Sequence, residues 1–342
     1  MMNLQHQVLS YLEARIPGAT DMKITRFENT PAGRGGSRNC FIFTAEWKEA
    51  NEAKTGHYVL RQDPEASLLE SDRETEFRIL KALEKTDVAV PKVYWLERGP
   101  SLLGRPFIIM EHLTGDVTSF FNLVGGDNAS LRAERAKETV VLLSRLHTLD
   151  WRKQGLDFLG VPAGAGEFAA AQIDYWESFF NKFKLETQLV LREAFLWMHD
   201  HIPKAGQLSL VHGDFKTDNI MYDGSRIKGL LDWELSAIGD PLADLAWMSM
   251  GFWKVGDLCS GLISKKDLIS EWERLTGYVA DEQSLLFWEV LSNVKLAVIH
   301  IIGAHSFATR TSCAVTKSLA TGALSAFFNM RILKNICELL KF

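Results

Sequence analysis

Three side chains that could bind a metal ion and move a proton lie within one short stretch of the sequence, 210–234. Asp214 and Asn219 stand in a polar segment, and Asp232 follows two further apolar runs. Carboxylate and amide oxygens that meet at one point suit Mg²⁺, which keeps several waters and takes its other ligands from substrate phosphates. Phosphoryl transfer needs such ligands together with an acid that orients a hydroxyl group. These residue types therefore predict phosphoryl transfer, with a metal-dependent hydrolase as the alternative.

Short apolar runs on either side must position these residues. The runs predict three small strands, at 208–211, 220–222 and 227–231. Asp223-Gly224, between the last two runs, is a hairpin turn signal. Such strands would bring Asp214, Asn219 and Asp232 to one end of a small sheet.

The triplet His212-Gly213-Asp214, followed by Asn219 and Asp232 at this spacing, resembles the catalytic and metal loops of the aminoglycoside phosphotransferase family. The members are small-molecule kinases with a protein-kinase-like fold. Protein kinases have Arg in the triplet and Phe-Gly after the second acid. Here Gly213 and Trp233-Glu234 take those places, which indicates the small-molecule branch. The resemblance implies that Asp214 is catalytic, that Asn219 and Asp232 hold Mg²⁺, and that ATP is the phosphate donor.

The resemblance also implies an α+β fold of two lobes. Residues 1–113 would form a nucleotide-binding lobe, a five-stranded antiparallel sheet with a helix, and 114–342 a mainly helical lobe for catalysis and acceptor binding. Strand-forming runs agree with this division, at 23–27, 40–47, 57–61, 91–96 and 107–112. Helical patterns follow at 130–148, 168–202, 242–252, 266–276, 282–309 and 316–340.

A glycine-rich segment between the first two predicted strands contains Gly35, Gly36 and Ser37. Backbone N–H groups of such a loop can approach phosphates, because glycine has no side chain to keep the ligand away. An ordinary hairpin turn has the same composition and binds nothing. The loop precedes a strand that bears a cation and resembles the family's phosphate-covering loop, so we expect it to contact the nucleotide.

The third predicted strand ends in Arg61, where the family usually has a lysine that pairs with the nucleotide phosphates. Arginine keeps the charge and adds a planar fork of donors, so the resemblance implies the same role; a surface ion pair is the alternative. In the predicted helix 66–85, Glu76 falls on the inward face, where a lone acid would be costly. Arg61 is its expected partner, and Glu70 and Glu74 stay open as the paired acid.

The last predicted strand leads into a hinge between the lobes. The resemblance implies that backbone groups of Glu111 and His112 contact the adenine there. It also implies that His147, Asp240 and Asp244 brace the active-site loops without touching substrate.

Three further positions have less specific predictions. His212 is expected to hold its loop by hydrogen bonds. Lys216 either contacts the transferred phosphate or lies in solvent. Of the ten tryptophans, Trp176 and Trp253 are candidates for the acceptor pocket, and most of the others should lie in the core.

The overall composition excludes several classes of protein. A net charge of −5 provides no basic surface for nucleic acid and no polybasic patch for a membrane. The four cysteines lack metal-ligand spacing, which favours reduced thiols. The start of the chain lacks the features of a signal peptide, and the apolar run 296–302 is too short to span a bilayer. We therefore expect a cytoplasmic protein that binds neither nucleic acid nor membranes.

The sequence thus predicts transfer of the γ-phosphate of ATP to a hydroxyl group of a small molecule, with GTP left open as a donor. Two segments, VLRQDP and LGRPFIIMEHLTG, resemble kinase domains found with acyl-CoA dehydrogenases, which implies hydroxyacyl acceptors, including CoA thioesters. Aminoglycosides, other amino sugars, choline-like alcohols and sugars stay open, although the terminal helices contain no dense acidic cluster that an aminoglycoside would require. A catalytically silent nucleotide-binding module is the remaining alternative, and the Arg at position 61 supports it.

Overall fold

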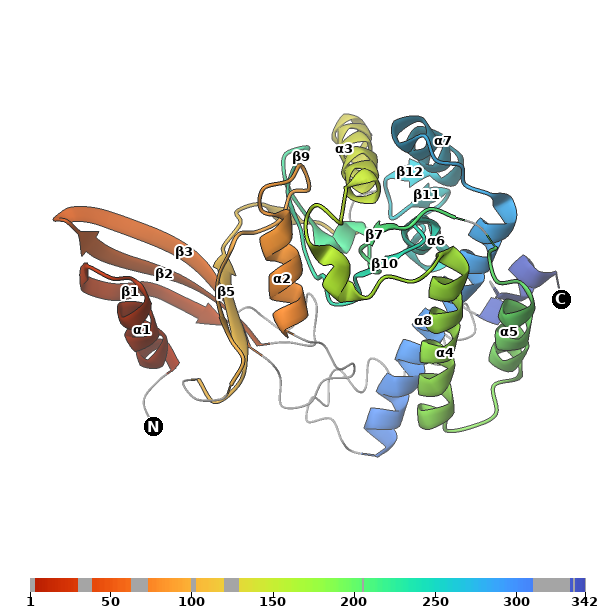
Figure 1. The fold of residues 1–342 in the computed structure, drawn as a ribbon, viewed down its shortest axis with the longest axis horizontal. Helices are drawn as coiled ribbons and strands as arrows, with labels where there is room; N and C mark the ends of the chain where they lie inside the picture. The colour runs from red at the N-terminus through yellow and green to blue at the C-terminus, as the bar shows by residue number, and fades with distance from the viewer. Residues whose placement is uncertain are drawn as a thin grey trace. The chain divides into compact units, whose positions relative to one another are not determined.

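The structure is a computed structural model that describes residues 4–29, 39–62, 73–99, 103–119, 129–204, 206–309, 333–334 and 336–341. The chain forms two compact units, Met1–Thr114 and Gly115–Phe342 (Figure 1). The first unit is built on a sheet and the second is mainly helical, which confirms the predicted α+β fold. The functional roles given to the two parts stay predictions.

The first unit is a five-stranded antiparallel sheet with two described helices. Its elements are α1 Leu4–Arg15, β1 Ala19–Asn29, β2 Asn39–Glu49, β3 Glu52–Gln62, α2 Arg73–Leu83, β4 Val93–Glu97 and β5 Phe107–Glu111. The strands lie in the order β1-β2-β3-β5-β4, and every neighbouring pair is antiparallel. The predicted sheet is therefore confirmed.

Helix α1 covers the three long strands, beside which it lies in Figure 1. Its Val8, Tyr11 and Leu12 share a buried cluster with Phe43 of β2 and Leu60 of β3. Their spacing of three and four residues places these side chains on one face of the helix. Helix α2 packs instead on β4 and β5; the part of the predicted helix before residue 73 lies outside the described residues.

The second unit contains most of the helices and three small sheets. Its elements are β6 Asp116–Val117, α3 Ala129–Thr148, the 3₁₀ turn η1 Leu156–Leu159, α4 Ala165–Phe183, α5 Leu189–Asp200, β7 Ser209–Val211, the 3₁₀ turn η2 Thr217–Asn219, β8 Ile220–Asp223, β9 Arg226–Leu230, β10 Ala237–Gly239, α6 Leu242–Ser249, the 3₁₀ turn η3 Gly251–Trp253, β11 Leu258–Cys259, β12 Ile263–Ser264, α7 Lys265–Thr276 and α8 Glu282–Ala308.

One predicted helix is wrong. The sequence pattern predicts a single helix over 168–202, but the chain forms α4 and α5 with a break between them. The two helices pack on each other and both contact α8. The break lets both apolar faces reach α8, which one continuous helix of that length would not allow. Most of the helix predicted at 316–340 lies outside the described residues.

The predicted strands around the catalytic loop exist, but they do not form one sheet. Strand β7 pairs with β10, whereas β8 and β9 form a hairpin that β6 extends. The turn signal at Asp223-Gly224 is confirmed, and Gly224 has a φ of 61°, which glycine adopts without strain. The polar loop thus runs from one small sheet to the next.

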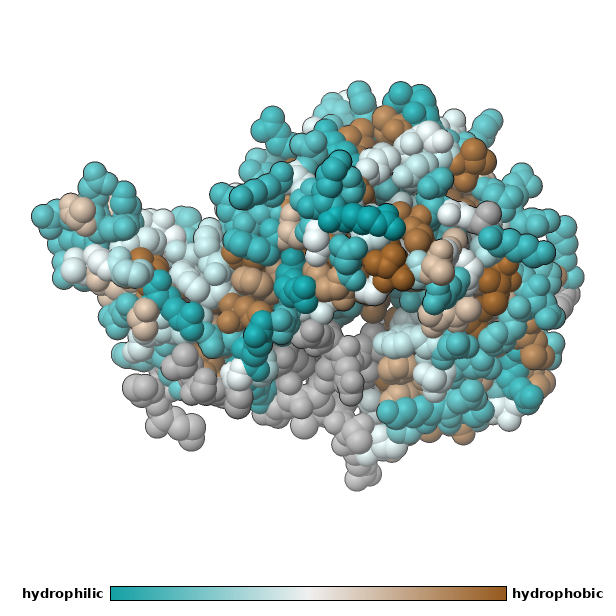
Figure 2. All heavy atoms as spheres, viewed as in Figure 1, coloured by the Kyte–Doolittle hydropathy of each residue, from teal (hydrophilic) through white to brown (hydrophobic). Residues whose placement is uncertain are grey.

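Helix α8 is the apolar centre of the second unit. By length and composition it could cross a membrane, and it is the one such helix among the described residues, much longer than the run 296–302 suggests. Of its most apolar window, 72% is buried inside the protein, against α4, α5 and α6. This burial is that of a core helix. The visible face of the unit is mainly hydrophilic, with smaller apolar patches between the polar side chains (Figure 2).

Candidate active site

The loop after β7 is constrained by a glycine. Gly213 has a φ of 78°, and a Cβ atom added there would lie 2.2 Å from the carbonyl oxygen of Leu235. A backbone oxygen cannot swing away as a flexible side chain would. The glycine that replaces the arginine of protein kinases is therefore required by the packing of this loop.

Asp214 is the most heavily hydrogen-bonded side chain of the loop. Lys216 Nζ donates to both of its carboxylate oxygens, at 2.5 and 2.6 Å. The Nδ2 amide of Asn219 donates to Oδ2 at 2.7 Å, and the indole Nε1 of Trp247 donates to Oδ1 at 2.8 Å. The carboxylate is thus held in one orientation while its side chain stays 15% exposed. Because Lys216 is paired and only 16% exposed, its solvent alternative is wrong.

Asn219 and Asp232 come to the same end of the β8–β9 hairpin. Asn219 directly precedes β8, and its carbonyl oxygen accepts a hydrogen bond of 2.8 Å from Leu231, the residue before Asp232. The amide nitrogen of Asn219 faces Asp214, donating to its carbonyl oxygen at 2.9 Å as well as to its side chain. The amide oxygen is therefore left for another partner.

This donor set fits Mg²⁺. An amide oxygen and a carboxylate are hard ligands, and Mg²⁺ fills its remaining positions with water and phosphate oxygens. The described residues contain no group of three or more His, Cys, Asp or Glu side chains that could hold a metal by themselves. A cation at this hairpin end would thus depend on Asn219, Asp232 and the phosphates of a bound ligand.

The buried carboxylate of Asp244 holds the loop after β7 by hydrogen bonds. Asp244, at the start of α6, is fully buried and accepts hydrogen bonds from the backbone N–H groups of His212 at 2.7 Å and Gly213 at 2.8 Å. It also pairs with His147 Nε2 of α3 at 3.2 Å. Burial alone would raise the pKa of Asp244, but the hydrogen bonds from the His147 side chain and the His212 backbone oppose it, and the pKa lies below its usual value.

The hydrogen bonds of His147 define its tautomer. Trp272 Nε1 of α7 lies 2.9 Å from His147 Nδ1, and an indole N–H can only donate. Nδ1 is therefore the acceptor, and Nε2 carries the hydrogen that faces Asp244. One carboxylate thus ties α3, α6 and α7 to the loop that contains Asp214.

His212 and Asp240 are structural, as their contacts demonstrate. Asp214 N donates to His212 Nδ1 at 3.2 Å, so Nε2 carries the hydrogen and donates to the Leu231 carbonyl at 2.9 Å. Burial lowers the pKa of His212, which keeps the ring neutral. Asp240 accepts from the N–H of Leu242 at the start of α6 and from Trp288 Nε1, both at 2.9 Å. Burial raises the pKa of Asp240.

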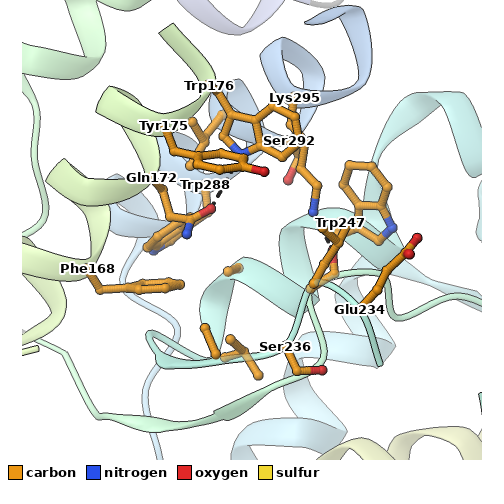
Figure 3. Close-up of a pocket in the computed structure, with 16 residues that line it drawn as sticks. Phe168, Gln172, Tyr175, Trp176, Glu234, Ser236, Trp247, Trp288, Ser292 and Lys295 are labelled. Atoms are coloured by element: carbon orange, nitrogen blue, oxygen red, sulfur yellow. Dashed lines mark hydrogen bonds between the residues drawn. The ribbon is translucent and has the colours of Figure 1, made fainter. Parts of the chain in front are cut away.

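A pocket of about 210 Å³ adjoins the loop within the second unit. The lining combines aromatic side chains with polar ones such as Gln172 and Glu234; Trp176 is one of the aromatic residues, whereas Trp253 does not line the pocket. Figure 3 shows Gln172, Tyr175 and Trp176 of α4 along one side of the pocket and Lys295 of α8 close to Trp247. Asp214 itself is not part of the lining, but Gly213, the residue before it, is, and Trp247, which lines the pocket, donates to the Asp214 carboxylate.

In the first unit, the expected ion pair between Arg61 and Glu76 is present. Arg61 Nη1 lies 2.6 Å from Glu76 Oε1, and Glu76 is only 2% exposed. Arg73 Nη1 pairs with the other carboxylate oxygen at 2.7 Å. Glu74 pairs instead with Arg98, and Glu70 lies outside the described residues; the acid that pairs with Arg61 is Glu76. Whether Arg61 contacts a nucleotide stays a prediction.

The remaining residues predicted to contact the nucleotide lie in the glycine-rich loop and at the end of β5. Gly35, Gly36 and Ser37 lie outside the described residues. The N–H of Glu111 donates to the Lys92 carbonyl at 2.8 Å, and that of His112 to the His57 carbonyl at 3.1 Å. Both donors are used within the sheet, so Glu111 and His112 can serve a nucleotide only through their carbonyl oxygens. The next N–H, that of Leu113, has no acceptor among the described residues.

Three residues of the two units make contacts that were not predicted from the sequence: Lys295, Trp247 and Arg73. A signal existed for Lys295, which stands alone as a cation in the apolar stretch 290–302 of the longest helix. No signal distinguished Trp247 from the other tryptophans on apolar helices. Arg73 lay on the same helical stripe as Glu76, three residues before it, which is the spacing of an ion pair.

A protein-family model and several proteins of known sequence match this chain. The model of the phosphotransferase enzyme family matches residues 48–277. The rat acyl-CoA dehydrogenase family member 11 is 30% identical over 311 residues, which are 85% of this chain. A second relative is the mouse acyl-CoA dehydrogenase family member 10. This chain spans only 18% of the length of that mouse protein and 38% of the length of the rat protein.

Two solved structures share the fold. A candidate aminoglycoside phosphotransferase from Ralstonia eutropha has a TM-score of 0.74 at 23% identity, over 97% of this chain and 98% of that chain. The streptomycin–ATP complex of APH(2″)-IIa has a TM-score of 0.58 at 17% identity, over 88% of this chain and 91% of that one. At these identities the likeness concerns the fold alone.

Proposed function

Because the chain belongs to the phosphotransferase enzyme family, whose model matches residues 48–277, we propose that it transfers the γ-phosphate of ATP to a hydroxyl group of a small molecule. The observation that carries this proposal is the held carboxylate of Asp214, with Asn219 bonded to it and Asp232 at the same hairpin end. APH(2″)-IIa, which shares the fold, has been solved with ATP and streptomycin together.

Asp214 has the geometry of the residue that orients the acceptor. Its carboxylate accepts the hydrogen bond of the attacking hydroxyl and takes the proton as the new oxygen–phosphorus bond forms and the bond to the departing ADP breaks. Asn219 and Asp232 would hold Mg²⁺, which supplies neutralisation of the phosphate charge. Positioning and charge stabilisation provide most of the rate in such a transfer.

In the first unit, Arg61 is proposed to pair with the nucleotide phosphates, oriented by its ion pair with Glu76. Leu113, with an N–H that no described residue accepts, is the proposed donor to the adenine edge. Glu111 would contribute its carbonyl oxygen.

For the acceptor we propose a hydroxyacyl compound, free or as a CoA thioester. The similarity to acyl-CoA dehydrogenase family members supports it, although this chain spans a minor part of those proteins. The aromatic lining of the pocket suits an acceptor with an apolar body. Glu234 is the single acid in that lining, which argues against an aminoglycoside with several positive charges.

The first test is the melting temperature with ATP or GTP, each with and without Mg²⁺. A ligand at about 100 times its Kd stabilises the native state by about 2.7 kcal/mol, which corresponds to roughly 4 °C in the melting temperature of a chain of 342 residues. We expect a Mg²⁺-dependent shift that Asp232→Ala removes. Asp223→Ala is the matched control, because this exposed acid lies in the same hairpin.

Turnover separates the enzyme from the alternatives. Asp214→Ala should lose at least about 100-fold in kcat with hydroxyacyl acceptors, since it removes the group that receives the proton, while the nucleotide shift persists. Nucleotide binding without turnover on any acceptor would favour a silent binding module. Release of phosphate from an ester without ATP would favour a metal-dependent hydrolase.

A further inference from the structure

A cation with unused hydrogen-bond donors faces the pocket beside the catalytic loop. Lys295 Nζ donates one hydrogen bond, of 2.5 Å, to the carbonyl oxygen of Gly213. An ammonium has three N–H donors. Among the described residues Lys295 has no ion pair and no second hydrogen bond. Two donors are therefore left for something that enters the pocket.

The surroundings make an incompletely satisfied cation costly. Lys295 is partly buried, and its Nζ lies 4.3 Å from the ring centroid of Trp247 and 5.7 Å from that of Trp176. These aromatic faces attract a cation but accept no strong hydrogen bond. Burial lowers the pKa of Lys295 to about 8, opposed in part by Asp214, Asp244 and Glu234 and aided by Lys216. A polar ligand atom would relieve this cost.

The position of the ammonium relates it to the reaction. Gly213, which accepts its hydrogen bond, directly precedes Asp214, and Trp247 contacts both Lys295 and Asp214. Figure 3 shows the ammonium nitrogen of Lys295 directed toward Trp247 and the pocket interior. A molecule in the pocket would thus meet the cation beside Gly213 and Trp247, the two residues that connect the pocket to Asp214.

We infer that Lys295 is a specificity-determining residue of the acceptor site: its unused N–H groups bind a carbonyl or carboxylate oxygen of the acceptor, whose apolar part packs on Trp176 and Trp247. This inference rests on the proposed function. It assigns the acceptor a class, a hydroxyl compound with an oxygen acceptor at its other end. A cationic acceptor would meet a like charge at the same place.

The test measures binding without turnover. Three probes of similar size carry a hydroxyl group and a different second group: 3-hydroxybutyrate, 3-hydroxybutyramide and 4-amino-2-butanol. Their dissociation constants are measured by ligand-observed NMR titration of the full chain at pH 7. We expect 3-hydroxybutyrate to bind at least about 10-fold more tightly than 4-amino-2-butanol, the ratio for one charge-assisted hydrogen bond. Lys295→Met, similar in length and uncharged, should remove this preference.

Two variants separate recognition from a supporting role. Lys295→Arg keeps the charge and should keep the preference for the carboxylate. Lys266→Met makes the same lysine-to-methionine substitution at an exposed position of α7 that does not line the pocket, and should leave the ratio of affinities unchanged. Melting temperatures without ligand verify that each variant is folded.

Equal affinity of the wild type for the anionic and cationic probes would overturn the inference. So would a Lys295→Met variant that loses affinity for all three probes alike, because Lys295 would then only support the carbonyl of Gly213. The assay contains no nucleotide. Failure of the proposed kinase activity would show instead as a missing Mg²⁺–nucleotide shift, with the probe preference intact.

Discussion

Replacing Asp244 by Asn tests whether one buried carboxylate holds the catalytic loop. The carboxylate faces three donors, the N–H groups of His212 and Gly213 and the Nε2–H of His147. An amide offers one oxygen and one NH₂ group. If the oxygen keeps the bonds of Oδ2 to His212 and His147, the NH₂ group must face the N–H of Gly213 at the present 2.8 Å. His147 cannot relieve the conflict by shifting its proton, since Trp272 already donates to Nδ1.

The expected change in the free energy of unfolding follows from these contacts. A hydrogen bond to a charged group contributes about 1.5–3 kcal/mol, and a buried donor without an acceptor costs about 1–3 kcal/mol. The neutral amide recovers part of this loss because a charge no longer has to be buried. We therefore expect Asp244→Asn to lower the free energy of unfolding by about 2–4 kcal/mol. Turnover should fall as well, because Gly213 positions Asp214.

Urea unfolding followed by tryptophan fluorescence provides the measurement. Of the ten tryptophans, only Trp47 and Trp95 belong to the first unit, so the signal reports mainly on the unit that contains Asp244. Asp257→Asn, at an exposed position of the same unit, is the control and should leave the free energy of unfolding unchanged. A loss below about 1 kcal/mol for Asp244→Asn, within the range of ordinary point substitutions, would refute the reasoning.

Three further outcomes are expected. Gly213→Ala should destabilise the second unit by at least about 2 kcal/mol, because its Cβ would lie 2.2 Å from the Leu235 carbonyl; wild-type stability in the urea assay would contradict that close approach. Glu76→Gln should destabilise the first unit by about 3–5 kcal/mol, because it removes the buried charge that both Arg61 and Arg73 face, and a melting temperature equal to that of the wild type would speak against a buried pair. Affinity for 3-hydroxybutyrate should fall as the pH rises through about 8, where Lys295 loses its proton; the NMR titration should find no such dependence in Lys295→Met.

Local patterns were sufficient where the chain uses local signals. Asp223-Gly224 predicted the hairpin because the turn requires a residue with positive φ, which Gly224 supplies. Glu76 could be assigned an inward face and a partner because helical spacing and the cost of burying a lone acid act within one helix and its neighbour. The bracing role of Asp244 required the family resemblance.

Packing decided what the patterns missed. The break between α4 and α5 has no proline or glycine to mark it, and it is the packing of both helices on α8 that reveals it. Strand β10 has three residues, too few for any pattern. Lys295 could be noticed as a cation in an apolar stretch, but its bond to Gly213, 82 residues earlier in the chain, required the structure.

The contacts of Asp244 have a consequence for hydrogen exchange. His212 and Gly213 lie in a loop, where amide hydrogens normally exchange quickly with solvent. Here both N–H groups are bonded to a carboxylate with no exposed surface. Their deuterium uptake should therefore be as slow as that of the surrounding helices and should need cooperative opening of the whole unit. The conformational entropy of this loop is thus lost when the protein folds, so that a substrate does not have to order the loop when it binds.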